Sequence, residues 1–122
     1  MTFRRSALVA LCLAAASVSL EATNYNVTTT ADAGAGSLRK AIDDANANPG
    51  ADTIGFAIVG SGVHTIAPTS PLPQITGPVT IDGYTQPGSS ANTNPASQGL
   101  NTVLRIEIDG TNAGAVPCLF AA

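Results

Sequence analysis

Apolar positions in the stretch Gly36–Ile58 follow a helical pattern first and a strand-like pattern afterwards. Four apolar residues recur at i, i+3, i+4 and i+7, which is the spacing of one helical face; they are Leu38, Ala41, Ile42 and Ala45. Ser37 precedes them in the N-cap position, and Pro49 ends the helical region because proline disfavours the α conformation of the preceding residue. The pattern predicts a short amphipathic helix, which needs another element to cover.

The rest of the chain predicts short strands separated by turns rich in Gly, Pro, Asn and Ser. Residues that favour strands, mainly β-branched and aromatic ones, gather in five runs: 25–30, 53–59, 63–66, 79–81 and 103–108. In the first run Tyr25 and Val27 share one face, because side chains alternate along a strand. Between the last two runs lies a polar loop, Tyr84–Thr102, which we expect to be either a functional excursion or a mobile insertion.

Two of the predicted strands end in the same tripeptide, Ile-Asp-Gly, which is the nearest approach to an internal repeat. Its aspartates, Asp82 and Asp109, are about 27 residues apart, within the usual length of a solenoid repeat. A hairpin of the same strands is the alternative. The short strands, the glycine turns and the preceding helix favour a solenoid, whose first coil needs a cover. We therefore predict a mainly β fold, the start of a right-handed parallel β-helix with an N-terminal amphipathic capping helix.

Residues 1–22 are predicted to be a secretory signal peptide, followed by a single incomplete domain at 23–122. Two arginines form its basic start, and the apolar run 7–16 is too short to span a bilayer as a helix. Cleavage is expected after Ser19, which the small-residue rule favours, or after Ala22, which the polar start of the following segment favours. The chain is therefore expected to be secreted, or to reach the bacterial cell surface or periplasm.

Charge and cysteine content narrow the classes of partner. Without residues 1–22 the chain has three basic and seven acidic residues, a net charge of about −4. Such a balance argues against nucleic acid or an anionic membrane as the partner. Cys12 lies in the apolar run, so one cysteine, Cys118, remains after cleavage and no intramolecular disulfide is expected.

The helical stretch also resembles a known family. Residues 36–46, GSLRKAIDDAN, resemble the S-L-R-x-A-I-x-x-A-N signature near the N-terminus of many secreted bacterial right-handed parallel β-helix proteins, including CSLREA-type surface proteins. The resemblance extends over 25–114 and implies an adhesin-like exported protein, without implying an activity. Gly36 stands where the family commonly has cysteine, and Lys40 where it commonly has glutamate, so a disulfide that pins the helix is not implied here. Because family members continue for many coils, the chain is expected to be a fragment.

The residues that could be catalytic or bind a metal are better explained by structural roles close to their own positions in the chain. Asp82 and Asp109 could pair across neighbouring coils, as the carboxylates of polysaccharide lyases and hydrolases do for calcium or for acid–base work. The favoured interpretation is that each aspartate bonds nearby backbone while the following glycine supplies a positive φ. His64 stands in a strand without the further ligands that a zinc site needs.

The remaining polar candidates are also interpreted as structural. Asp43 and Asp44 are neighbours on the helix and diverge around its axis, as on a solvated face. Arg39 is expected to pair with Asp43 at i, i+4, and Ser37 to cap the helix rather than act as a nucleophile. The glycosylation acceptor pattern at 26–28 is expected to be a chance match. We therefore predict no catalytic, cofactor-binding or metal-binding residues.

These observations together predict a non-enzymatic structural or adhesive module of an exported protein. Its working surface would be the loop Tyr84–Thr102 and the outward Thr and Asn side chains of the strands, with a cell-surface glycan or protein as partner. Tyr25 and Tyr84 are the two candidate aromatic platforms for a glycan. Self-association through an open C-terminal coil is a further expectation. The alternative is the inactive N-terminal cap of a carbohydrate-active enzyme of the lyase or hydrolase type.

Overall fold

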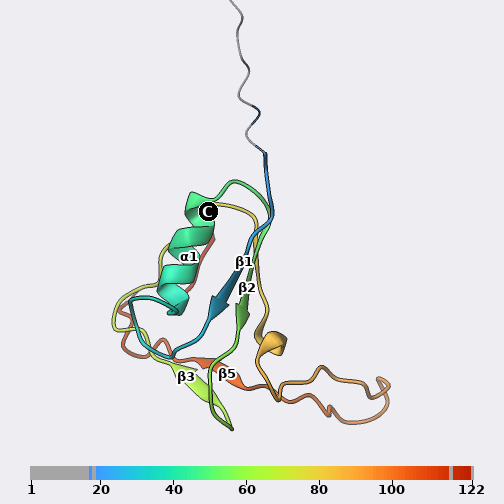
Figure 1. Cartoon of the computed structure of the whole chain (residues 1–122). Coiled ribbons are helices and arrows are strands. Elements are labelled where there is room, and N and C mark those ends of the chain that lie inside the picture. Colours follow the sequence, from blue (N-terminus) through green and yellow to red (C-terminus); the bar gives the residue numbers. More distant parts are fainter. Residues whose placement is uncertain (1–16, 18, 116, 122) are drawn as a thin grey trace, which may run out of the picture.

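The computed structural model describes residues 17, 19–115 and 117–121 (Figure 1). Most of the predicted signal segment, with Cys12, lies outside the described residues, as do positions 116 and 122. The elements, in chain order, are the strand β1 (Asn24–Val27), the helix α1 (Leu38–Ala47), the strands β2 (Asp52–Phe56), β3 (His64–Ile66) and β4 (Val79–Ile81), the 3₁₀ helix η1 (Gly83–Thr85) and the strand β5 (Ile106–Ile108). The predicted helix and all five predicted strands are therefore present, and every strand except β4 is shorter than expected.

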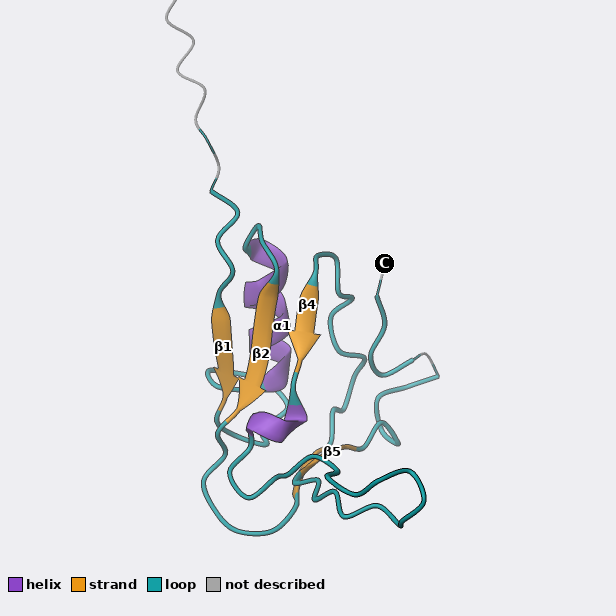
Figure 2. Cartoon of the chain, turned by 90° about the vertical axis from the view of Figure 1, so that its right-hand side faces the viewer, coloured by secondary structure: helices purple, strands orange, loops and turns teal. Residues whose placement is uncertain are grey.

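The strands form two separate parallel sheets. One has three strands in the order β1-β2-β4, and they lie side by side with α1 along one face (Figure 2). The other has two strands, β3 and β5. In the larger sheet Tyr25 is level with Ile54, and Ile54 with Ile81, so these three side chains form one inward row. Parallel strands need long connections, and the helix and the loops between the strands supply them.

The prediction of a right-handed parallel β-helix start is wrong. The described residues form one α-helix and two small parallel sheets, of three and two strands, and no solenoid is found among them. The two strands that end in Ile-Asp-Gly do not pair with each other: β4 pairs with β2, and β5 pairs with β3. The repeated tripeptide therefore does not mark neighbouring coils of a solenoid. The alternative, a hairpin of β4 and β5, is wrong for the same reason.

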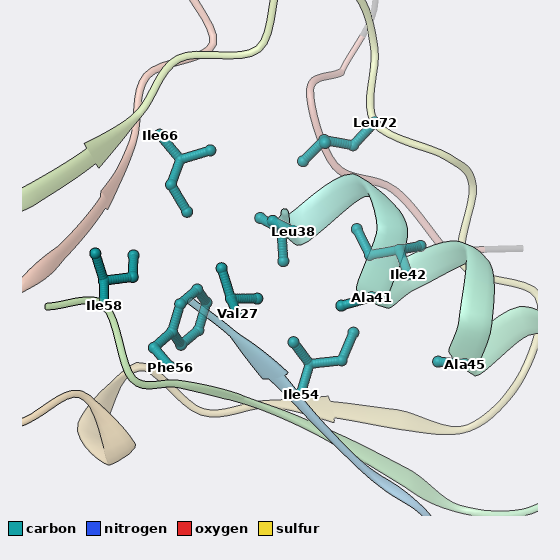
Figure 3. Packing of buried hydrophobic residues seen from close by; sticks show 10 residues of the cluster. All are labelled: Val27, Leu38, Ala41, Ile42, Ala45, Ile54, Phe56, Ile58, Ile66 and Leu72. Carbon is teal, nitrogen blue, oxygen red and sulfur yellow. The ribbon is translucent and has the colours of Figure 1, made fainter. Parts of the chain in front are cut away.

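The helix covers one face of the three-stranded sheet, and the core lies between them (Figure 3). The four residues of the predicted apolar face are all buried, with Leu38 0% and Ile42 1% exposed. Facing them from the sheet are Val27, Ile54 and Phe56, each at most 2% exposed. The predicted helical face is confirmed, and burial of each large aliphatic side chain contributes about 1.5–3 kcal/mol.

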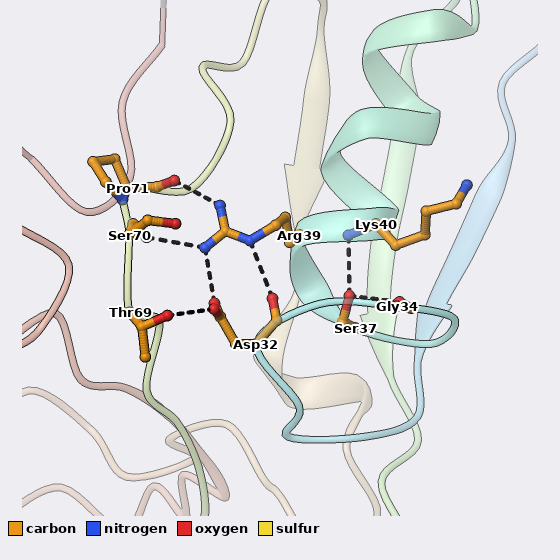
Figure 4. A network of polar contacts seen from close by, with 8 residues as sticks. All are labelled: Asp32, Gly34, Ser37, Arg39, Lys40, Thr69, Ser70 and Pro71. Atoms are coloured by element: carbon orange, nitrogen blue, oxygen red, sulfur yellow. Dashed lines mark hydrogen bonds and ion pairs between the residues drawn. The ribbon is translucent and has the colours of Figure 1, made fainter.

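The start of α1 is fixed by Ser37 and by the glycine before it. The Ser37 hydroxyl accepts a hydrogen bond from the Lys40 amide at 3.2 Å and donates one to the Gly34 carbonyl at 2.7 Å, which confirms the predicted N-cap (Figure 4). Gly36 has a φ of +76°, and a Cβ there would lie 2.3 Å from the Thr28 hydroxyl oxygen. Glycine is therefore required at this position for both conformation and space.

Arg39 does not pair with Asp43 as predicted, but reaches away from the helix to Asp32 and to the segment after β3 (Figure 4). Its guanidinium donates to an Asp32 carboxylate oxygen at 2.8 Å and to the carbonyls of Ser70 and Pro71 at 3.0 and 2.6 Å. Its Nε also donates to the Asp32 carbonyl at 3.1 Å. A planar guanidinium has several donors in a fixed fork, so it can serve four acceptors that an i, i+4 pair would leave unsatisfied. On the helix surface the i, i+4 ion pair joins Lys40 and Asp44 instead.

Acid should weaken this network through Asp32. The pKa of the Asp32 carboxyl is lowered, first by the hydrogen bond from Arg39 and then by the one from the Thr69 hydroxyl. A carboxylate whose pKa is lower in the folded than in the unfolded chain adds stability above about pH 4, and this stability is lost as pH falls through the folded pKa. We expect the midpoint temperature of thermal unfolding to decrease as the pH is lowered below about 4. Asp32→Asn should make this decrease smaller.

Two comparisons make the acid experiment specific. The pKa of Asp109 is also lowered, by hydrogen bonds from Thr111, so Asp32→Asn should leave part of the slope in place. Asp43→Asn removes an exposed carboxylate from the same region and is the matched control. An Asp32→Asn profile that runs parallel to the wild-type profile between about pH 5 and pH 2 would contradict the assignment.

Candidate functional site

The candidate site is the long loop between η1 and β5, which projects from the body of the molecule (Figure 1). Its two ends meet at an antiparallel bridge between Ser90 and Val103, where both backbone hydrogen bonds measure 2.9 Å. The Thr102 hydroxyl adds a hydrogen bond to the Ser90 carbonyl at 2.9 Å. The loop therefore has a closed neck, and its tip is the segment between these two residues.

Polar side chains form hydrogen bonds across the tip of the loop. Asn101 and Thr93 bond twice: the Thr93 amide donates to the Asn101 side-chain oxygen at 2.9 Å, and the Asn101 side-chain amide donates to the Thr93 hydroxyl at 2.8 Å. The Asn92 side chain accepts from the Asn101 backbone amide at 3.1 Å and donates to the Asn94 carbonyl at 3.1 Å. The polar, aperiodic sequence thus encodes an ordered excursion, since Asn side chains readily replace backbone partners in turns.

Gln86 fastens the near end of the loop to the core. Its side chain is 1% exposed and bonds both backbone groups of Ile58: it accepts from the amide at 2.8 Å and donates to the carbonyl at 2.7 Å. Ile58 follows β2, so the glutamine amide continues the sheet where no strand pairs with it. Sequence reasoning missed this residue, because one glutamine in a polar loop carries no periodic signal.

Exposed apolar side chains stand at the loop and its neck, and we call them the loop surface: Tyr84, Leu100, Val103 and Leu104. Leu100 is 80% and Leu104 57% exposed. The Tyr84 hydroxyl is hydrogen-bonded to the Thr102 hydroxyl at 3.2 Å, which keeps its ring against the neck. Exposed large apolar side chains on a projecting loop make this loop a candidate protein contact surface.

The outer face of the three-stranded sheet carries the predicted row of polar side chains. Asn24 is level with Thr53, and Thr53 with Thr80, on the face opposite the core residues. Asn24 and Thr80 are exposed and Thr53 is half-buried. Tyr25 does not join this row: it packs against the core, and its hydroxyl donates to the Asp44 carbonyl at 3.3 Å. Tyr84 is therefore the more accessible of the two tyrosines.

Asp82 and Asp109 act locally, as the favoured interpretation predicts. The Asp82 carboxylate accepts from the Tyr84 amide at 2.9 Å and caps η1, while Asp109 accepts from the Thr111 amide at 2.9 Å. Hydrogen bonds from the Thr111 hydroxyl and amide lower the pKa of Asp109. The strands before the two aspartates lie in different sheets. The two carboxylates therefore serve separate turns.

The glycines after these aspartates have a different role from the predicted one. Neither Gly83 nor Gly110 has a positive φ. Gly110 is required for space instead, because a Cβ there would lie 2.9 Å from the Cβ of Cys118. Cys118 itself is half-buried and carries a free thiol.

His64 begins β3, and its Nε2 atom is buried without a hydrogen-bond partner in the described part of the chain. Among residues 17, 19–115 and 117–121, no three His, Cys, Asp or Glu side chains are grouped as a metal site would need. No pocket is found on the same residues, and none of their helices is long and apolar enough to cross a membrane.

Comparison with models of protein families, with curated proteins and with solved structures finds no match to this chain.

Proposed function

We propose that this chain is an exported, non-enzymatic structural or adhesive module that binds a protein partner through the loop surface. The observation that carries the proposal is the loop itself: its polar groups are used to hold its shape, while Leu100 and Leu104 stay exposed. An ordered loop that presents apolar side chains loses little conformational entropy on binding. The signal-like pattern of residues 1–22, and the resemblance of residues 36–46 to exported surface proteins, support a location outside the cytoplasm.

A protein partner is favoured over a glycan by the hydrogen bonds of the loop. Recognition of sugar hydroxyls needs polar side chains that are free to bind them, together with aromatic faces. Here Asn92 and Asn101 are already bonded within the loop. The exposed leucines offer no hydrogen bonds and suit the apolar centre of a protein interface. The alternative function, the inactive cap of a carbohydrate-active enzyme, has no comparable observation in its favour.

Substitution of the two leucines tests the proposal. The variant Leu100→Ser/Leu104→Ser should bind intact producing cells at least tenfold more weakly than the wild-type chain, because central apolar contacts carry about 1–2 kcal/mol each. The probe is the fluorescently labelled protein purified after export, and the measurement is the bound fraction as a function of concentration. Val59→Ser is the control, because Val59 is 92% exposed and lies outside the loop.

Treatment of the cells identifies the chemistry of the partner. Mild protease digestion of the cell surface should abolish binding, whereas periodate oxidation of surface glycans should leave it unchanged. Binding that survives protease and is lost after periodate would replace the protein partner with a glycan. Equal binding by the double-serine variant and the wild type would remove the loop surface from the proposal.

A further inference from the structure

Asp52, the first residue of β2, is a buried carboxylate with no cation beside it in the described part of the chain. It is 2% exposed, and neither of the two ion pairs among the described residues includes it. Its Oδ1 atom accepts from the Thr23 backbone amide and from the Asn48 side-chain amide, both at 2.8 Å. Its Oδ2 atom is buried and has no hydrogen-bond partner among the described residues. Burying a carboxylate is unfavourable unless an opposite charge or further donors compensate it.

The nitrogen that faces Asp52 belongs to the residue after one of the two expected cleavage positions. Hydrolysis there breaks the amide bond between Ala22 and Thr23. Water supplies the hydroxyl that leaves with the Ala22 carbonyl as a carboxylate, and the Thr23 nitrogen takes up the protons. At neutral pH this nitrogen becomes an α-ammonium group. One neutral N–H donor would thereby become a cation with three N–H donors.

We propose that the export peptidase cleaves between Ala22 and Thr23, and that the new α-ammonium group forms an ion pair with the buried carboxylate of Asp52. The inference rests on the proposed export of the chain. The ammonium supplies the missing cation and has a donor for Oδ2 as well as for Oδ1. Its position is already set, because the Thr23 carbonyl accepts from the Thr53 amide at 2.9 Å, within the sheet. Maturation would then complete the edge of the sheet.

Neighbouring contacts are consistent with a cut at this bond. Ala22 is exposed, whereas Thr23 is the first residue tied to the sheet. The Asn48 side-chain amide bonds the Thr23 hydroxyl at 3.1 Å and Asp52, and both contacts survive the cut. Its contact with the Glu21 carbonyl, at 3.1 Å, is the one that is lost. Cleavage after Ser19 would leave three residues ahead of Thr23 and keep its nitrogen an uncharged amide.

The N-terminus of the exported protein gives the first test. The full chain is expressed in a bacterial host, and the product is recovered from periplasm and medium for intact mass measurement and N-terminal sequencing. A product that begins at Thr23 is expected. A product that begins at Leu20 would overturn the proposed cut while leaving export standing. A chain that stays uncleaved in the cytoplasm would overturn the export on which the inference rests.

Amine labelling of the processed protein tests the ion pair without any substitution. Residues 23–122 contain one lysine, Lys40, so the folded product has two amines. The Lys40 side chain is 51% exposed and serves as the internal control. The Thr23 amine should react with an acylating reagent at least tenfold more slowly in the folded protein than in urea, while Lys40 changes much less. Equal protection of the two amines would overturn the ion pair.

A double comparison then assigns the protection to Asp52. A chain that retains Glu21 and Ala22 should unfold roughly 5–10 °C below the chain that begins at Thr23. In the Asp52→Asn background this difference should shrink to about 2 °C or less, because no carboxylate remains to pair. If the two extra residues lower the unfolding temperature equally in the wild-type and the Asp52→Asn chains, Asp52 is not the partner. If Asp52→Asn does not fold, the labelling result decides.

Discussion

Leu38→Ala is expected to lower the free energy of unfolding by about 3 kcal/mol, a large part of the roughly 5–15 kcal/mol that stabilises a domain. Leu38 is fully buried where α1 meets the sheet, in the same cluster as Val27 and Phe56 (Figure 3). Alanine and leucine are both good helix formers, so the loss reports the cavity and the lost apolar burial. Urea denaturation followed by circular dichroism measures it.

The fold predicts that the loss of stability depends on which face of α1 is changed. Lys40→Ala on the exposed side of the same helix should cost no more than about 0.5 kcal/mol, since it removes only a surface ion pair with Asp44. Leu38→Met should cost less than about 1.5 kcal/mol, because it nearly conserves volume. If Leu38→Ala and Lys40→Ala had similar effects, the helix would not be packed against the sheet as described.

The helix was predictable because its information is local. The i, i+3, i+4 and i+7 spacing of its apolar residues sets its buried face, and the Ser37 hydroxyl sets its start. Both were predicted from sequence and both are confirmed. The strands were also located, since β-branched runs between glycine turns are local signals. The strand at Val79–Ile81 has the predicted bounds, whereas the last one begins at Ile106 rather than at 103.

The pairing of the strands was not predictable in the same way. The Ile-Asp-Gly tripeptide occurs twice, which suggested that the two strands before it are neighbours. Asp82 and Asp109 instead each form a turn after strands that belong to different sheets. Asp-Gly is favoured in turns for local reasons, so its recurrence says little about which strand lies beside which. Arg39 shows the same limit: its partners lie 7 to 32 residues away, beyond the helix on which an i, i+4 rule operates.

The residues of greatest interest gave the weakest sequence signal. Asp52 and Gln86 are polar, and both lie outside the helix and strands that the sequence predicts. Both are buried because a partner from another part of the chain meets them, Thr23 in one case and Ile58 in the other. A buried polar group is tolerated where its hydrogen bonds are made, and those bonds depend on the tertiary fold. Hence they appear only in the structure.

Gln86→Ala is expected to lower the free energy of unfolding by about 2–4 kcal/mol, although the residue lies in a loop. The substitution removes both partners of the Ile58 backbone, leaving a buried amide and a buried carbonyl unsatisfied. Each such group costs about 1–3 kcal/mol when it is left without a partner. Gln98→Ala is the matched control, because Gln98 is exposed in the same loop and should change stability by less than about 0.5 kcal/mol.

Because Gln86 joins the loop to the core, its loss should also free the loop. Amide hydrogen exchange should then accelerate across Ser90–Val103 and at Ile58, while the amides of α1 keep their protection relative to the new global stability. Gln86→Glu separates shape from hydrogen bonding: the carboxylate can still accept from the Ile58 amide but cannot donate to its carbonyl. If the alanine variant unfolds like the Gln98→Ala control, the loop is held by its neck alone, and the loop surface owes its position to Ser90 and Val103 rather than to Gln86.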